Sequence, residues 1–220
     1  MIKKTAIKTI YFVRHGESEG NTKPVFQSLD SPLTSKGRKQ AQYIAERASH
    51  LSFEAIIASP LSRAKETAEI ITKKVKKSLE FSDLFIERIK PTETMGRPYT
   101  DEKAKQLYME WMKSLFTPGF RAKDGENFND IITRAKRALE YLSKRSEKEL
   151  LVVTHGFFLR TMVAIVVLGD TISDKSFKQF QERVGMENTG LTILILDDND
   201  DNIDGLSWRL WVWNDYAHLG

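Results

Sequence analysis

The stretch TIYFVRHGESEGN, from Thr9 to Asn21, changes character after its fifth residue. The first five residues are apolar or β-branched, and Arg14, His15 and Gly16 follow at once. A short continuous run of this kind is typical of a strand that is buried on both faces of a parallel sheet. Ligands of α/β proteins bind beyond the carboxyl ends of such strands, so Arg14 and His15 are candidate site residues.

Two other predicted strands also end in residues that carry chemistry. Leu150–Thr154 is followed by His155 and Gly156, which repeats the histidine-glycine order of the first strand. Ala55–Ala58 is followed by a Ser-Pro turn and a helix with Arg63 in its first turn. If these strands share one sheet, two histidines and two arginines meet at one edge, where helix N-termini also favour anions. Phosphate, a tetrahedral dianion, fits such a set of donors and cations.

Strands and helices alternate along the chain, which predicts an α/β fold. Strands are expected at Thr9–Val13, Ala55–Ala58, Leu150–Thr154, Leu191–Leu196 and Leu206–Trp213, with a weaker one near Leu79–Ile86. Helices are expected at Lys36–Leu51, Ser62–Val75, Glu102–Phe116, Phe128–Leu142 and Phe157–Leu168. We therefore expect a three-layer α/β/α sandwich over residues 1–220, with a mostly parallel central sheet and an antiparallel edge strand.

Two connecting segments have distinct characters. The last two strands are joined by DDNDDNIDG, which is typical of a hairpin loop at the antiparallel end of the sheet. Residues 88–125 are interrupted by Pro91, Pro98 and Pro118. We expect this segment to be a small helical lid inserted over the edge of the sheet that holds the site.

The composition limits the classes of function. The chain has 220 residues, 40% of them hydrophobic, a net charge of +4 and no cysteine. A core of good size is therefore expected, whereas disulfides, cysteine-bound metals and a thiol nucleophile are excluded. The small positive charge does not indicate a nucleic-acid partner. The longest apolar run, Phe157 to Gly169, is too short to span a bilayer, and the N-terminal residues lack a signal-peptide pattern, so a cytoplasmic protein without a membrane partner is expected.

The ordered motifs resemble the histidine phosphatase superfamily, also described as phosphoglycerate-mutase-like, over nearly the whole chain. The resemblance rests on VRHGESEGN, DSPLTSKGRKQAQ, SPLSRAKETAEII, DGENFNDIITRAKRAL, VVTHG and ENTGLTIL, in that order. It implies that His15 is a nucleophile that forms a phosphohistidine. The ring must then be neutral, with one nitrogen held protonated by a backbone carbonyl in the Arg14–Gly16 loop.

The resemblance also implies which residues bind the phosphate. Arg14, Arg63 and His155 match positions that hold the equatorial oxygens through the transition state, and His155 is expected to be protonated for this. Asn21 matches a position whose side-chain amide contacts the phosphate.

Ser18 and the N–H of Gly156 are expected as secondary contacts of the phosphate.

Two residues of the predicted site also have an alternative interpretation. An asparagine in a loop, such as Asn21, commonly serves turn geometry, and His15 alone could be a structural histidine in a tight turn. The agreement of all the motifs favours the catalytic interpretation.

A leaving alkoxide needs a proton, and the family's acid is expected in LFIERIKPTETMG. Glu87 is the best match, and Glu93 is its main rival because spacing varies in this region. A carboxylic acid beside a dianion holds its proton more tightly and can donate it. Water would then attack the phosphohistidine with the same carboxylate acting as base.

One feature favours the phosphatase branch of the family. Related mutases carry a Gly-Trp element soon after the first motif, whereas NTKPVFQSLDSPLT contains no tryptophan. We expect a phosphomonoesterase that acts on a small-molecule phosphate monoester; a cofactor-dependent phosphoglycerate mutase and a non-catalytic phosphate-ester binding module are the alternatives. No metal-binding spacing of histidines occurs, so no metal or other cofactor is expected. The strand LSWRLWVW could be an edge that pairs with a second copy in a homodimer.

Overall fold

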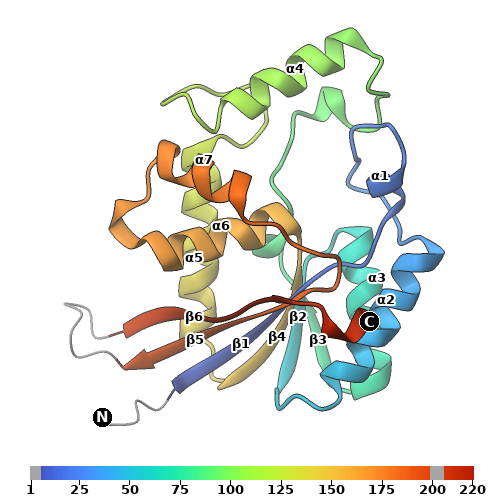
Figure 1. The fold of residues 1–220 in the computed structure, drawn as a ribbon, viewed down its shortest axis with the longest axis vertical. Helices are drawn as coiled ribbons and strands as arrows, with labels where there is room; N and C mark the ends of the chain where they lie inside the picture. The colour runs from blue at the N-terminus through green and yellow to red at the C-terminus, as the bar shows by residue number, and fades with distance from the viewer. Residues whose placement is uncertain (1–5, 199–205) are drawn as a thin grey trace.

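The structure is a computed structural model that describes residues 6–198 and 206–220 (Figure 1). Six strands form one sheet in the order β3-β2-β4-β1-β5-β6. The strands are β1 (Ala6–Arg14), β2 (Ala55–Ala58), β3 (Ser78–Phe81), β4 (Glu149–Thr154), β5 (Leu191–Asp198) and β6 (Leu206–Asp215). Strands β1 to β4 pair in parallel, and β5 runs antiparallel to both of its neighbours. The predicted fold class, with a mostly parallel sheet and an antiparallel end, is confirmed.

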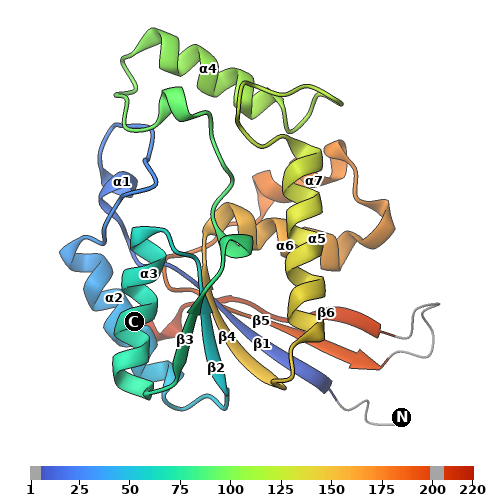
Figure 2. The same cartoon turned by 180° about the vertical axis from the view of Figure 1, so that it is seen from behind.

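Helices cover both faces of the sheet (Figures 1 and 2). The α-helices of the described residues are α1 (Glu19–Thr22), α2 (Ser35–Ala48), α3 (Ser62–Val75), α4 (Glu102–Lys113), α5 (Phe128–Lys144), α6 (Gly156–Leu168) and α7 (Asp174–Arg183). Helices α2 and α3 lie on one face, and α5 and α6 lie on the other, with α7 packed beside α6. Within the described part of the chain, no helix is both long enough and apolar enough to cross a membrane.

Strand β4 shows why the central strands are continuously apolar. Leu150 and Val152 pack in the cluster under α5 and α6, whereas Leu151 and Val153 pack in the cluster under α2 and α3. All four side chains are fully buried. Because successive side chains of a strand point to opposite faces, a strand between two helical layers needs apolar residues at every position.

The differences from the predicted elements are local. The weak strand predicted near Leu79–Ile86 is shorter, because β3 ends at Phe81 and a 3-10 turn follows at Asp83–Phe85. Helix α7 was not predicted, since Phe177 is its one buried residue and most of its residues are polar. Strands β5 and β6 pair as the hairpin prediction requires, but most of the DDNDDNIDG loop lies outside the described residues.

Residues 88–125 extend beyond the carboxyl ends of the parallel strands, and α4 is their outermost element (Figure 2). The segment has a small apolar cluster of its own, formed by Leu107, Trp111 and Ala122. Arg88 joins it to the rest of the protein. The buried Arg88 guanidinium lies 3.8 Å from the ring centroid of Trp111 and donates to the carbonyl oxygens of Trp111 and Glu126. The function of this segment as a lid stays a prediction.

Candidate active site

The parallel pairing of β1 with β4 brings two histidines together. Arg14 and Thr154 are paired in register at the ends of these strands, and His15 and His155 follow them. The two imidazole ring centroids are 5.1 Å apart, and both side chains are buried. The two histidine-glycine corners of the sequence therefore lie at one point of the sheet edge.

His15 is held in one tautomer. Its Nδ1 lies 2.7 Å from the carbonyl oxygen of Gly16, and a carbonyl can only accept, so Nδ1 carries the proton. Nε2 then has a free lone pair, which accepts a hydrogen bond from Arg63 Nε at 3.2 Å. Burial lowers the pKa of His15 well below its usual 6.5, and the charges of Arg63 and Arg14 lower it further. A neutral ring with an unprotonated Nε2 is the form that a nucleophile requires.

The surroundings of His155 also favour a neutral ring, and the expectation that it is protonated while it binds phosphate stays a prediction. Burial lowers its pKa well below 6.5, and nearby Arg63 adds to the effect. Its Nε2 lies 2.7 Å from the hydroxyl of Ser59, which also accepts from the N–H of Leu61. The Ser59 hydrogen can therefore go to Nε2, which leaves the ring proton on Nδ1. A neutral His155 still offers an N–H donor from Nδ1.

Three buried nitrogens at the site have no hydrogen-bond partner among the described residues. They are Arg14 Nε, Arg63 Nη1 and His155 Nδ1. A buried donor without a partner costs about 1–3 kcal/mol, so native proteins keep few of them. Three donors in one place indicate a site built for an acceptor with several oxygens.

Two glycines allow close approaches that shape this site. A Cβ on Gly156 would lie 3.1 Å from Arg14 Nε, so glycine lets the guanidinium lie against the start of α6. A Cβ on Gly16 would lie 2.5 Å from the carbonyl oxygen of Gly37. The loop after β1 and the start of α2 can therefore cross only without a side chain at this point.

Several residues that were not predicted hold the end of β1. Asn188 Nδ2 donates to the carbonyl oxygen of His15 at 2.9 Å, and the Thr189 N–H donates to that of Arg14 at 3.0 Å. The Thr67 hydroxyl accepts from the Gly16 N–H at 3.1 Å. All three lie in motifs that the sequence analysis quoted, which is the signal that could have found them. Their contacts are to backbone groups, however, and no residue spacing marks such contacts.

Asn21 lies in the wall of a cavity of about 220 Å³ that Arg14, His15 and Gly156 also line. Its Oδ1 accepts from both the N–H and the hydroxyl of Ser18, each at 3.0 Å. The NH₂ group of Asn21 is therefore the end that can serve an anion. Ser18 is fully buried and gives its hydroxyl hydrogen to Asn21, so it orients the Asn21 amide; the expected contact of Ser18 with phosphate stays a prediction.

Glu87 lines the same cavity and sits at the N-terminus of α6. Its carboxylate accepts from the N–H groups of Phe157 at 3.2 Å, Phe158 at 3.0 Å and Arg88 at 2.9 Å. Two of these bonds go to Oε1 and one to Oε2. A carboxylate has about four acceptor positions, so the remaining one is on Oε2 and can hold a proton.

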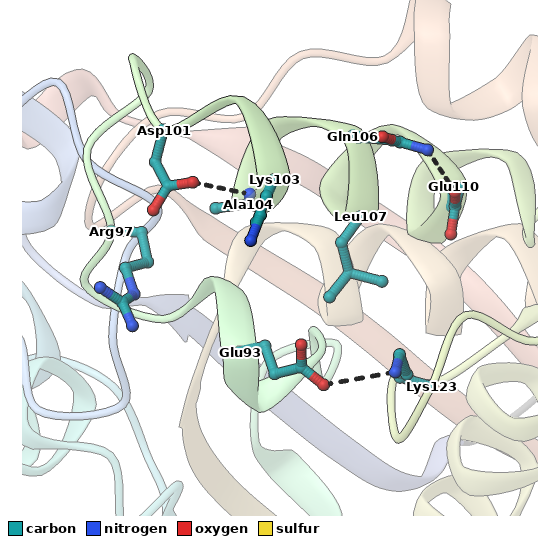
Figure 3. Close-up of a pocket in the computed structure, with 9 residues that line it drawn as sticks. All are labelled: Glu93, Arg97, Asp101, Lys103, Ala104, Gln106, Leu107, Glu110 and Lys123. Atoms are coloured by element: carbon teal, nitrogen blue, oxygen red, sulfur yellow. Dashed lines mark hydrogen bonds and ion pairs between the residues drawn. The ribbon is translucent and has the colours of Figure 1, made fainter.

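Glu93 lies in a different cavity, beneath α4. Figure 3 shows its carboxylate directed at Lys123, and the two charged groups are 3.6 Å apart. None of the residues that line this cavity also lines the one around His15. The geometry therefore favours Glu87 over Glu93 as the group that reaches a leaving alkoxide.

The charge of the site is strongly positive. Burial lowers the pKa of Arg63 to about 10, and Glu87 partly opposes this shift, so the guanidinium stays charged at neutral pH. Burial also lowers the pKa of Arg14, which Glu87 again partly opposes. In the part of the chain that the structure describes, no group of three or more metal-binding side chains is arranged to hold a metal ion. The arrangement suits an oxyanion bound by cations and N–H donors.

The two neutral histidines predict that acid destabilises the fold. Because the folded-state pKa values of His15 and His155 lie below the usual 6.5, the unfolded chain binds up to two more protons at acid pH. Their contribution to stability is complete above about pH 7.5 and is lost as the pH falls through about 6.5, the pKa of histidine in the unfolded chain. Below this pH the free energy of unfolding decreases by up to ~2.7 kcal/mol per pH unit. Urea denaturation at a series of pH values measures the slope.

The exposed His50 provides the matched control for this measurement. His155→Asn should lower the slope between about pH 6.5 and 5 by up to ~1.4 kcal/mol per pH unit, which is the share of one histidine, whereas His50→Asn should change the slope much less. An unchanged slope in a folded His155→Asn variant would show that this histidine is not held neutral.

Comparisons with known proteins show the family to which the chain belongs. Residues 10–209 match the sequence model of the histidine phosphatase superfamily (branch 1). "Probable phosphoglycerate mutase GpmB" of Enterobacter sp. (strain 638) is 33% identical over 168 residues, which cover 72% of this chain and 74% of the relative. The solved structure of Bacillus stearothermophilus YhfR superposes with a TM-score of 0.77 at 29% identity, over 97% of this chain and 100% of that one. The alpha-ribazole phosphatase from Shigella flexneri shares the fold, with a TM-score of 0.74 at 21% identity over 95% and 97% of the two chains. The chain belongs to the histidine phosphatase superfamily.

Proposed function

We propose that the protein is a phosphomonoesterase that hydrolyses small-molecule phosphate monoesters through a phosphohistidine on His15. The observation that carries the proposal is that three buried N–H donors without a hydrogen-bond partner belong to Arg14, Arg63 and His155, which lie beside His15, whose Nε2 is unprotonated. A phosphoryl group in transfer has three equatorial oxygens, whose charge such donors stabilise. The membership of the chain in the superfamily supports the same chemistry.

The first step transfers the phosphoryl group to the protein. The Nε2 lone pair of His15 attacks phosphorus while the bond from phosphorus to the ester oxygen breaks. Arg63 Nε, which donates to Nε2 in this structure, turns to a phosphate oxygen as the ester enters. Glu87 Oε2 gives its proton to the leaving alkoxide. The hydrogen bond from His15 Nδ1 to Gly16 stabilises the positive charge on the phosphorylated ring.

The second step returns the protein to its starting state. Water attacks phosphorus from the side that the alcohol has left, and Glu87 accepts a proton from it. The bond between phosphorus and Nε2 breaks, the electron pair returns to the ring, and inorganic phosphate leaves. Splitting one difficult displacement into two in this way is the usual benefit of covalent catalysis.

The nucleophile gives the first test. The protein should hydrolyse p-nitrophenyl phosphate in the presence of EDTA, and His15→Asn should lower kcat by at least about 10³-fold because no phosphohistidine can form. Mass spectrometry after an alkaline quench should show one added phosphoryl group on the wild-type chain alone. His50→Asn is the control and should match the wild type. A His15→Asn variant with near-normal turnover would contradict the proposal.

The proton donor gives a second test, because p-nitrophenolate leaves without protonation and an alkoxide does not. In Glu87→Gln, p-nitrophenyl phosphate should give a stoichiometric burst of p-nitrophenol followed by slow turnover, since only the attack of water then lacks its base. Glycerol 3-phosphate should be hydrolysed about 10²–10⁴-fold more slowly, without a burst. Glu93→Gln should behave as the wild type in stopped-flow assays. If Glu93→Gln showed the burst and the slow hydrolysis of glycerol 3-phosphate while Glu87→Gln behaved as the wild type, Glu93 would be the proton donor.

A phosphoglycerate mutase is the second candidate, and it is favoured by the name of the relatives that are 33% identical. The absence of tryptophan from residues 21–34 supports hydrolysis instead. Supplying 3-phosphoglycerate with a trace of the bisphosphate separates the two. Release of inorganic phosphate without 2-phosphoglycerate is expected. Rapid isomerisation with little phosphate release would replace the proposed function by the mutase.

A further inference from the structure

A second cavity, of about 400 Å³, adjoins the phosphate site. The two cavities share Gln27, Glu87, Phe157 and Arg160 in their walls. The apolar part of the larger wall comes mainly from α4 and the segment after it, through Tyr108, Trp111, Met112, Leu115 and Phe116. Because the cavities meet at the proposed proton donor Glu87, the alcohol part of a bound ester lies in the larger one. We call it the leaving-group cavity.

Two cations line the leaving-group cavity and are bonded to neutral groups. Lys90 Nζ donates to the carbonyl oxygen of Gln27 at 3.0 Å. Arg160 Nη1 donates to the carbonyl oxygens of Gln181 and Val184 at 2.9 and 3.1 Å. An ammonium group has three donors and a guanidinium has five, so both side chains keep donors that these carbonyls do not use.

Glu87 is the anion that Lys90 and Arg160 share. Its charge opposes the effect of burial on the pKa of each of them. In the proposed mechanism, however, Glu87 must carry a proton when it acts as the acid. At that moment Lys90 and Arg160 lose this counter-charge in a partly desolvated cavity. An anionic group on the alcohol would replace it.

The other charged and titratable groups around Lys90 do not replace this counter-charge. Arg63 and Arg88 are cations and lower the pKa of Lys90 further. Tyr108 from α4 and Glu182 from α7 are the remaining titratable groups of the cavity wall, and neither is among the charges that shift the pKa of Lys90; Glu182 lies 3.9 Å from Lys178. Burial is the largest cause of the shift, and the pKa of Lys90 is about 8. The charge of Lys90 therefore changes in a pH range that activity assays can reach.

We propose that Lys90, together with Arg160, binds a second anionic group on the alcohol part of the substrate and so determines specificity. The preferred substrates are phosphate monoesters whose alcohol joins an apolar or aromatic part to a carboxylate or similar anion. The apolar part would pack against Trp111 and Phe157, and the anion would bind to Lys90. This inference rests on the proposed function and adds the substrate class to it.

Two esters that differ only in charge test the inference: 3-carboxyphenyl phosphate and 3-carbamoylphenyl phosphate. The wild type should favour the carboxylate about tenfold in kcat/KM near pH 7, because a hydrogen bond to a charged group is worth that much. The preference should fall as the pH rises to about 9 and Lys90 loses its charge. The ratio of the two values cancels the effect of pH on the catalytic groups.

Variants of Lys90 separate binding from a merely structural effect. Lys90→Met should lose the preference at every pH, because kcat/KM should fall about tenfold more on the carboxyphenyl ester than on the carbamoyl ester. Lys90→Arg should keep the preference up to about pH 9, because a guanidinium does not titrate there. Lys123→Met, in the separate cavity beneath α4, is the matched control and should resemble the wild type.

Two outcomes would overturn the inference, and only the second would also contradict the proposed phosphatase function. A wild-type ratio near one, or an equal loss on both esters in Lys90→Met, removes the role of Lys90 and leaves the phosphatase intact. No hydrolysis of either ester or of p-nitrophenyl phosphate removes the proposed function and the inference with it.

Discussion

The site depends on the direct, parallel pairing of β1 with β4. In the observed register the two strands end opposite one another, so the next residue of each is a histidine at the same edge of the sheet. A shift by one residue would turn alternate side chains to the other face and separate the two rings. Such a shift is strongly disfavoured, since both faces of β4 are packed between helical layers. The packing of the core therefore determines the position of the two histidines.

The same burial also determines their protonation. A histidine in water would be partly charged near its usual pKa, and a charged ring could not attack phosphorus. Enclosing His15 and His155 among Arg63 and Arg14 makes the neutral ring the stable form. Carbonyl and hydroxyl partners then decide which ring nitrogen keeps the proton. The same arginines that would bind a dianion in the proposed function thus add to the effect of burial in keeping His15 neutral.

The sequence was sufficient to place those residues of the site that come directly after a strand. Apolar runs mark buried strands, and the residues after them, His15 and His155, can be placed at one edge by the rules of parallel sheets. The choice between Glu87 and Glu93 needed the structure, because both follow β3 in irregular chain where no period relates a residue to a direction. The burial of His155, which favours its neutral form, also needed the structure, because it depends on packing that no local motif records.

Arg88 shows how residues 88–125 are connected to the cavity around His15. Its backbone N–H donates to Glu87 Oε1, while its guanidinium lies on Trp111 and donates to the carbonyl oxygen of Glu126. One buried residue therefore links the proposed proton donor to the aromatic wall of the leaving-group cavity. Any displacement of α4 that carries Trp111 with it must strain or break the contacts of this residue. The cavity that would recognise the alcohol and the carboxyl group that would protonate it are consequently held in a constant relation, although they belong to segments with different packing. This relation suits a reaction in which the proton must reach one particular oxygen of the bound ester.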